Sequence, residues 1–137
     1  MRLDRMGFPA GYLFLFLVAG CATMNTMRSA SPLAGQAVYV DAPYSTVYSA
    51  AMQCSGELGL TIAEANEATR IIYASHGMSF TSFGERVRIL FDTTEADRVG
   101  MRVLSKPLWA TSFFAPDWGE RLVQCTMWKV QGQGITQ

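Results

Sequence analysis

The sequence predicts a two-layer α+β domain, in which two helices cover one face of an antiparallel sheet of about four strands. Three observations support this. Residues 85–92 and 98–105 each alternate apolar and polar side chains, as half-buried strands do. The segment that begins at Pro43 repeats its apolar residues at spacings of three and four, as an amphipathic helix does. The expected order is strand, helix, three strands, helix (β-α-β-β-β-α).

The first half of the domain is expected to contain one strand and one helix. Residues 36–41 (QAVYVD) alternate, with Tyr39 on the opposite face from the two valines, which predicts a short strand. Pro43 suits a first helical position because its missing N–H is not needed there. The helix ends near Gly59. Its apolar stripe consists of Val47, Ala51, Cys54 and Leu58.

The second half is expected to supply three strands and a closing helix. Residues 70–75 (RIIYAS) form the first of these strands, and a five-residue polar turn joins the alternating pair into a hairpin. Asp117 stands three residues ahead of Glu120, a capping-box-like pattern that predicts a helix over 118–130. The apolar spacing of this last segment is mixed, so a final strand is the alternative.

The composition excludes several kinds of chemistry. The 137 residues include 11 basic and 11 acidic side chains, so no overall field recruits nucleic acid. One histidine and three cysteines, widely spaced, predict no metal site. Neither a GxxxxGK nor a GxGxxG motif is present, so no cofactor is expected. No nucleophile, base and orienting group can be assembled around His76, and we expect the protein not to be an enzyme.

The N-terminus has the layout of a secretory signal peptide. Residues 1–5 carry two basic side chains, and residues 12–18 are uninterruptedly apolar. The apolar region spans about 15 residues, fewer than the roughly 20 that a membrane-spanning helix needs. It ends in Val18-Ala19-Gly20-Cys21, which resembles the lipobox of bacterial lipoproteins. The resemblance implies that residues 1–20 are removed and that Cys21 is acylated.

The lipobox also implies a location for the protein. Ala22 follows Cys21, where an Asp commonly retains lipoproteins in the inner membrane, so the expected destination is the outer membrane, with the domain facing the periplasm. Several acyl chains on one residue make such an anchor effectively permanent. We expect residues 21–34 to be the lipidated N-terminus and a flexible tether that spans on the order of 20 Å. Residues 35–130 would form the periplasmic domain, and residues 131–137 a disordered tail.

The domain resembles small envelope lipoproteins of uncharacterised function with a helix-grip-like fold. The likeness covers residues 36–130 and rests on four short motifs, which are Ala42-Pro43-x-x-x-Val47, Gly84-Glu85-Arg86-Val87, Val103-x-Ser105-Lys106-Pro107 and Asp117-Trp118-Gly119. Likeness of fold does not transfer function, and the function we expect first is that of a non-catalytic, lipid-anchored protein that docks on an envelope partner. The alternative is a module that binds a small ligand or lipid in the cleft between helices and sheet, lined by Met78, Phe80 and Phe83.

Arginines gather on the polar face of the predicted hairpin. If its turn sets Val87 opposite Val103, then Arg88 lies opposite Arg102, and like charges in that position are destabilising. One interpretation is a site for phosphate or carboxylate groups, which guanidinium groups bind bidentately. The other is a solvated face, relieved by water and by carboxylates such as Glu85. The candidate anion or partner site consists of Arg86, Arg88, Arg98 and Arg102.

The connection before the last helix is rich in apolar side chains. It holds Leu108, Trp109, Phe113 and Phe114, and Trp118 follows. Exposed aromatic patches mark partner sites. Trp109, Phe113 and Phe114 are therefore a candidate apolar docking site. The alternative is that these rings cap the open end of the core.

Two cysteines remain once Cys21 is assigned to the lipid. Cys54 lies on the apolar stripe of the first helix, and Cys125 lies three residues after Leu122 on a comparable stripe of the last helix. Exported proteins seldom keep spare thiols in an oxidising compartment. We therefore expect a Cys54–Cys125 disulfide between the helices. Two separate buried thiols are the alternative.

Overall fold

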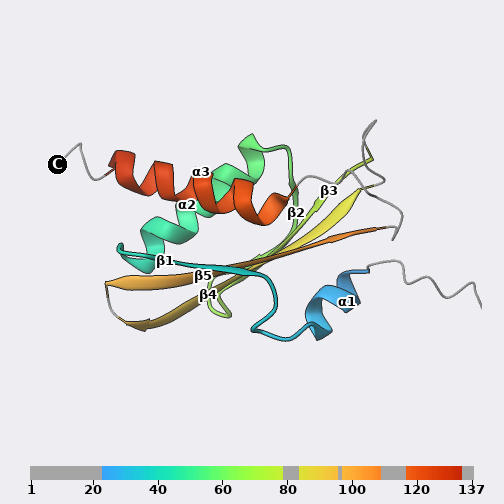
Figure 1. The fold of residues 1–137 in the computed structure, drawn as a ribbon, viewed down its shortest axis with the longest axis horizontal. Coiled ribbons are helices and arrows are strands. Elements are labelled where there is room, and N and C mark those ends of the chain that lie inside the picture. Colours follow the sequence, from blue (N-terminus) through green and yellow to red (C-terminus); the bar gives the residue numbers. More distant parts are fainter. Residues whose placement is uncertain (1–22, 79–83, 96, 109–116, 134–137) are drawn as a thin grey trace, which may run out of the picture.

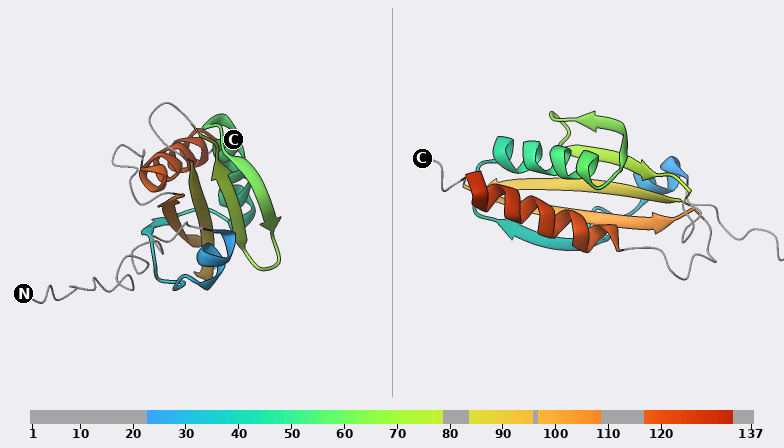
Figure 2. Two further views of the ribbon diagram at one scale, coloured as in Figure 1. Left: turned by 90° about the vertical axis from the view of Figure 1, so that its right-hand side faces the viewer. Right: turned by 90° about the horizontal axis from the view of Figure 1, so that it is seen from above.

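The computed structural model describes residues 23–78, 84–95, 97–108 and 117–133. Five strands form one antiparallel sheet in the order β1-β5-β4-β3-β2, with α2 and α3 on its inner face and α1 on its outer face (Figures 1 and 2). The predicted α+β class is confirmed. The elements are α1 (Met24–Ser29), β1 (Gln36–Val40), α2 (Tyr44–Glu57), β2 (Thr61–Asn66), β3 (Ile71–His76), β4 (Glu85–Glu95), β5 (Arg98–Pro107) and α3 (Trp118–Gln133).

The core lies between the inner face of the sheet and the pair α2 and α3. Alternate residues of β4 and β5 point into it, because successive side chains of a strand face opposite sides. They are Val87, Ile89, Phe91, Val99, Met101 and Val103, all at most 3% exposed. Val47, Ala51 and Cys54 of α2 and Leu122 of α3 are fully buried against them. The apolar stripe predicted for α2 is therefore correct for Val47, Ala51 and Cys54. Its fourth member, Leu58, is only partly buried.

Local chemistry sets where the two long helices start. Pro43 is the N-cap of α2, one position earlier than the first helical position expected for it. At the start of α3 the backbone N–H of Glu120 donates to Oδ1 of Asp117 at 3.2 Å, so the capping prediction is confirmed. The helix continues to Gln133, so the expected tail is helical over 131–133.

β2 is the strand that no sequence pattern predicted. Of its six residues only Ile62 is even partly shielded from solvent, so no apolar alternation marks it. It pairs with β3 at one edge of the sheet. Backbone N–H and C=O groups satisfy each other there regardless of the side chains. The sheet therefore has five strands rather than about four.

The β4–β5 hairpin is confirmed, but its register differs from the expected one by two residues. Val87 pairs with Ser105 rather than with Val103. The strands extend into the segment expected to be a polar turn, since Glu95 pairs with Arg98 and two residues remain between them. A register shift just before Glu95 makes this tighter turn compatible with the rest of the ladder.

The N-terminal segment is not the flexible tether that its composition predicted. Within residues 21–34, α1 begins at a capping box in which Thr23 and Thr26 each bond the other's backbone N–H. Met27, on the same helix, is fully buried. A helix that buries an apolar side chain on the sheet belongs to the domain, so the domain begins by residue 23 and not at residue 35.

Gly35 joins this segment to β1 at a position that only glycine fits. Its φ is +103°, and a Cβ built on it would lie 2.2 Å from the carbonyl oxygen of Val103. We expect Gly35→Ala to lower the free energy of unfolding by about 2 kcal/mol, because strain and a backbone clash add together. Urea unfolding of the purified domain measures this.

Gly59→Ala is the matched control for that substitution. Gly59 also has a positive φ, +82°, but a Cβ there meets nothing within 4 Å. It therefore reports the backbone strain alone, which is roughly 1 kcal/mol. Equal losses in the two variants would mean that the close approach of Gly35 to Val103 has no energetic weight.

Candidate functional site

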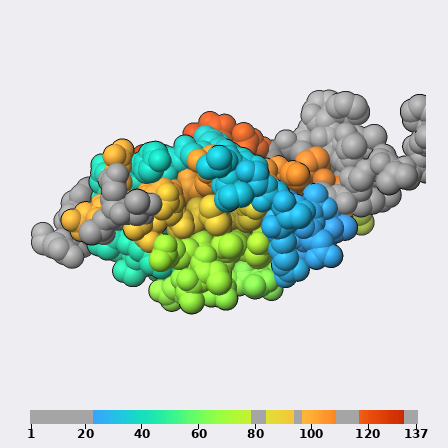
Figure 3. Space-filling model, turned by 90° about the horizontal axis from the view of Figure 1, so that it is seen from below, coloured from blue at the N-terminus to red at the C-terminus, as the bar shows by residue number. Residues whose placement is uncertain are grey.

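Arg88 is buried beneath the N-terminal segment and is 4% exposed. Its Nη1 donates to the carbonyl oxygens of Met27 at 3.0 Å and Ala30 at 2.8 Å, and its Nη2 donates to that of Ser31 at 2.6 Å. The final turn of a helix leaves such carbonyls without helical partners. Arg88 thus caps α1, which lies across the outer face together with the residues that follow it (Figure 3).

Arg102 and Arg98 are also engaged by the protein itself. Nη1 of Arg102 donates to the carbonyl oxygens of Leu33 at 2.8 Å and Gly35 at 3.4 Å. Nε of Arg98 lies 3.4 Å from Oδ1 of Asp41, and its guanidinium stacks 4.7 Å above the centre of the Tyr39 ring. Both side chains therefore tie β5 to the chain around β1.

These contacts revise the expected arginine site. Arg88 pairs with Leu104 across the ladder, so Arg102 is its diagonal neighbour on the same face and not its direct partner. The N-terminal segment covers the part of that face around Arg88, whereas Arg102 remains at the surface. Arg88 and Arg102 donate hydrogen bonds to backbone carbonyl oxygens of the protein. The sequence had suggested that an external anion would accept these bonds. The structure does not bring the four arginines together as one open site.

Arg86 has a different environment from the other three arginines. It pairs with Lys106 across the ladder, and both side chains are half-buried on the outer face. Within the described residues neither forms a hydrogen bond or an ion pair, and Nε of Arg86 is buried without a partner. Lys106 was not singled out from the sequence, although the alternation of β5 places it on the same face as Arg102.

An apolar groove of about 300 Å³ lies between the N-terminal segment and the outer face. Its side chains include Pro32, Leu33, Ala37, Tyr39, Leu90 and Arg102. Leu33 is 76% exposed and Tyr39 is 60% exposed. The groove is on the opposite side of the sheet from the helix-sheet cleft that the ligand-binding alternative requires.

The candidate apolar docking site, Trp109, Phe113 and Phe114, lies outside the described residues, as do Phe80 and Phe83. Three neighbours of these rings in sequence are described. Trp118 is 3% exposed and belongs to the core, Met78 is 79% exposed, and the backbone N–H of Leu108 donates to the carbonyl oxygen of Gly84 at 2.8 Å. This last bond joins the residue before β4 to the residue after β5, at one end of the sheet.

A buried carboxylate at this end was interpreted wrongly from the sequence. Glu85 is fully buried on the inner face instead of relieving the outer arginines. Its Oε2 lies 3.4 Å from Nδ1 of His76, whose ring is 4.8 Å from that of Trp118. The alternation of β4 already indicated this position, because Glu85 is two residues from Val87 and so faces the same side of the sheet. Within the described residues, Nδ1 of His76 has no hydrogen-bond partner.

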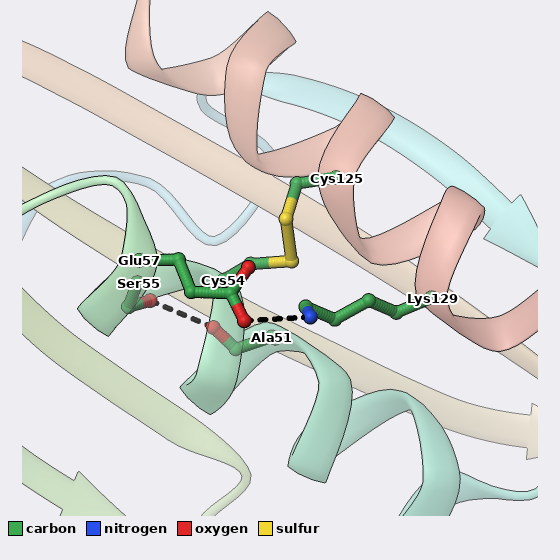
Figure 4. The surroundings of a disulfide bond; sticks show 6 residues. All are labelled: Ala51, Cys54, Ser55, Glu57, Cys125 and Lys129. Atoms are coloured by element: carbon green, nitrogen blue, oxygen red, sulfur yellow. Dashed lines mark hydrogen bonds and ion pairs between the residues drawn. A yellow bond between two sulfur atoms is a disulfide. The ribbon is translucent and has the colours of Figure 1, made fainter.

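The predicted bridge between Cys54 and Cys125 is present and joins α2 to α3, as Figure 4 shows. The two Cα atoms are 5.9 Å apart, within the range that a disulfide needs. Beside it Nζ of Lys129 lies 2.7 Å from Oε1 of Glu57 and links the same two helices. The covalent bond therefore fixes the helix layer against which the sheet packs.

Three further findings concern metal ligands, membrane-spanning helices and similar proteins. No three His, Cys, Asp or Glu side chains of the described residues lie together as metal ligands. No helix in the same part of the chain is long and apolar enough to cross a membrane. No protein-family model and no curated protein matches the sequence. Function is therefore inferred from the residues themselves.

Proposed function

We propose that this chain is a non-catalytic lipoprotein of the bacterial envelope. Signal cleavage frees Cys21, acyl chains on Cys21 hold it in the outer membrane, and the domain docks on an envelope partner in the periplasm. The lipobox-like Val18-Ala19-Gly20-Cys21 motivates the anchor. The residue after Cys21 is Ala22 and not Asp, which motivates the choice of the outer membrane.

The observation that carries the proposal is the pairing of the cysteines. The sequence has three, and Cys54 and Cys125 are joined to each other. A structural disulfide is typical of exported proteins, because the cytosol keeps thiols reduced. Cys21 is thereby left as the odd cysteine of the chain, at the position where lipoproteins carry their lipid.

Docking is favoured over internal ligand binding by how the interior is filled. Between the sheet and α2 and α3, the described core side chains are closely buried, with Val47, Ile89 and Leu122 at 0% exposure. Large apolar groups instead lie outside, where Trp128 of α3 is 73% exposed and Tyr39 of β1 is 60% exposed. Exposed aromatic side chains are enriched at protein interfaces.

The acyl anchor is tested by labelling cells with an alkyne fatty acid. We expect label on the wild-type protein and none on Cys21→Ser, which should also leave the membrane fraction. The double variant Cys54→Ser/Cys125→Ser is the matched control and should keep its label, because only Cys21 accepts the lipid. An unlabelled wild type in a Gram-negative host would refute the anchor.

Docking is tested in the same cells with a photo-crosslinking side chain at Trp128. We expect one discrete adduct with an envelope protein, reduced when Cys21→Ser releases the domain from its membrane. Gln53, an exposed residue of α2, is the control position and should give no such adduct. Identical adduct patterns from the two positions would indicate random collision and would count against a specific partner.

A further inference from the structure

Two cations face each other at one end of the sheet, which we call the Glu85–Pro107 end after the pair that closes the β4–β5 ladder there. The next pair is Arg86 and Lys106, on the outer face. Like charges directly across a ladder destabilise the strands that carry them. An anion bound between Arg86 and Lys106 would relieve this repulsion.

Among the described residues, no carboxylate forms an ion pair with Arg86 or Lys106. Other cations of the outer face each have an internal partner. Arg88 and Arg102 bind carbonyl oxygens, Arg98 lies beside Asp41, and Arg28 lies 2.7 Å from Oε2 of Glu64. Within the described residues Arg86 and Lys106 have none. The sequence segments 79–83 and 109–116, which precede β4 and follow β5 along the chain, contain no Asp or Glu.

The N-terminus of α1 lies at the same end. Figures 1 and 2 show α1 beginning where β4 starts and β5 finishes, and running from there across the outer face. Its N-cap is Thr23, two residues after Cys21. Two residues span at most about 7 Å. A lipid on Cys21 would therefore bring the Glu85–Pro107 end to the surface of the bilayer.

We propose that Arg86 and Lys106 bind the phosphate of anionic lipid headgroups in the leaflet that anchors Cys21. The inference rests on the proposed acylation for its location and adds the surface that faces the membrane. A guanidinium fork beside an ammonium group is suited to phosphate oxygens. With a lipid at Cys21 and this contact beside it, the domain is held in one orientation on the membrane.

The chain offers an internal comparison for testing this, because it has only two lysines, Lys106 and Lys129. Lys129 is in the helix layer, paired with Glu57. The mature chain is coupled through the thiol of Cys21 to a maleimide lipid, on vesicles of phosphatidylcholine alone or with one part in three of phosphatidylglycerol. Acetylation of each lysine by an N-hydroxysuccinimide ester is then followed by mass spectrometry.

We expect phosphatidylglycerol to slow acetylation of Lys106 roughly 25-fold and to leave Lys129 unchanged, since each cation near an anionic surface contributes about fivefold. In Arg86→Gln the slowing should fall to about fivefold, and 0.5 M NaCl should abolish it. Arg98→Gln is the matched control and should behave like the wild type. Unfolding midpoints of both variants establish that they remain folded.

Equal acetylation rates of Lys106 on the two vesicle types would overturn the proposal, as would equal slowing of both lysines. If 10 mM inorganic phosphate protects Lys106 on phosphatidylcholine vesicles to the same extent, the site takes free phosphate and the lipid assignment is wrong. Because the thioether replaces the natural lipid, these results do not depend on acylation in cells. The two proposals can therefore fail separately.

Discussion

Replacing Cys54 and Cys125 with serine should lower the free energy of unfolding by about 4 kcal/mol, the amount that chain entropy assigns to closing a loop of this length. The two residues are 71 positions apart. The loss is a large share of the 5–15 kcal/mol that holds a typical domain folded. We expect the double variant to unfold at a much lower urea concentration, as followed by circular dichroism.

The oxidised and reduced forms of the wild-type chain provide the comparison for this variant. Both measurements use a Cys21→Ser background, so that no third thiol can exchange with the pair. Dithiothreitol should move the wild type to the midpoint of the double variant and leave the variant where it is. If the oxidised wild type and the double variant have the same unfolding midpoint, the disulfide does not constrain the unfolded chain.

Arg88→Gln should release the N-terminal segment from the outer face. Three hydrogen bonds from a charged group end with the loss of the guanidinium, and we expect a net cost of about 3 kcal/mol for local opening. Trypsin cleavage after Arg28, which needs α1 to unfold, should then become roughly a hundredfold faster, because proteolysis follows the population of the open form.

Arg102→Gln is the matched control, since its bonds to Leu33 and Gly35 are exposed and should contribute less than about 1 kcal/mol. Mass spectrometry of the cleavage products reports the bond between Arg28 and Ser29 directly. If Arg88→Gln and Arg102→Gln are cleaved at the same rate there, the buried cap on α1 is not what holds the segment in place.

Local patterns were sufficient for the α+β class and for most of the elements. The alternation in β4 and β5 and the helical spacing around Cys54 reflect which face of each element is buried. Such periodicities are visible in the chain before it folds. They also placed Cys54 and Cys125 on facing stripes, which is why the bridge could be predicted from sequence alone.

Only the tertiary structure decided what the outer face does. From the sequence, Arg88 is expected to be a solvated strand residue. In the structure α1 lies over it, and its partners Met27 and Ser31 are 61 and 57 positions away in the chain. Every residue has a backbone carbonyl oxygen, whatever its side chain. The sequence therefore does not indicate which of these oxygens will accept a hydrogen bond from an arginine. The β4–β5 register likewise depended on a bulge near Glu95, which alternation does not reveal.

Arg86 differs from the other candidate arginines in its partners. By sequence, Arg86, Arg88, Arg98 and Arg102 share one face of a hairpin and are equivalent. After folding, three of them contact carbonyl oxygens or Asp41 from the N-terminal part of the chain, and Arg86 is left beside Lys106. The sequence alone determined the face on which these charges lie, because strand periodicity is local. Which charges remain available was decided by the packing of distant segments, because a charge is neutralised by whatever the fold brings near it.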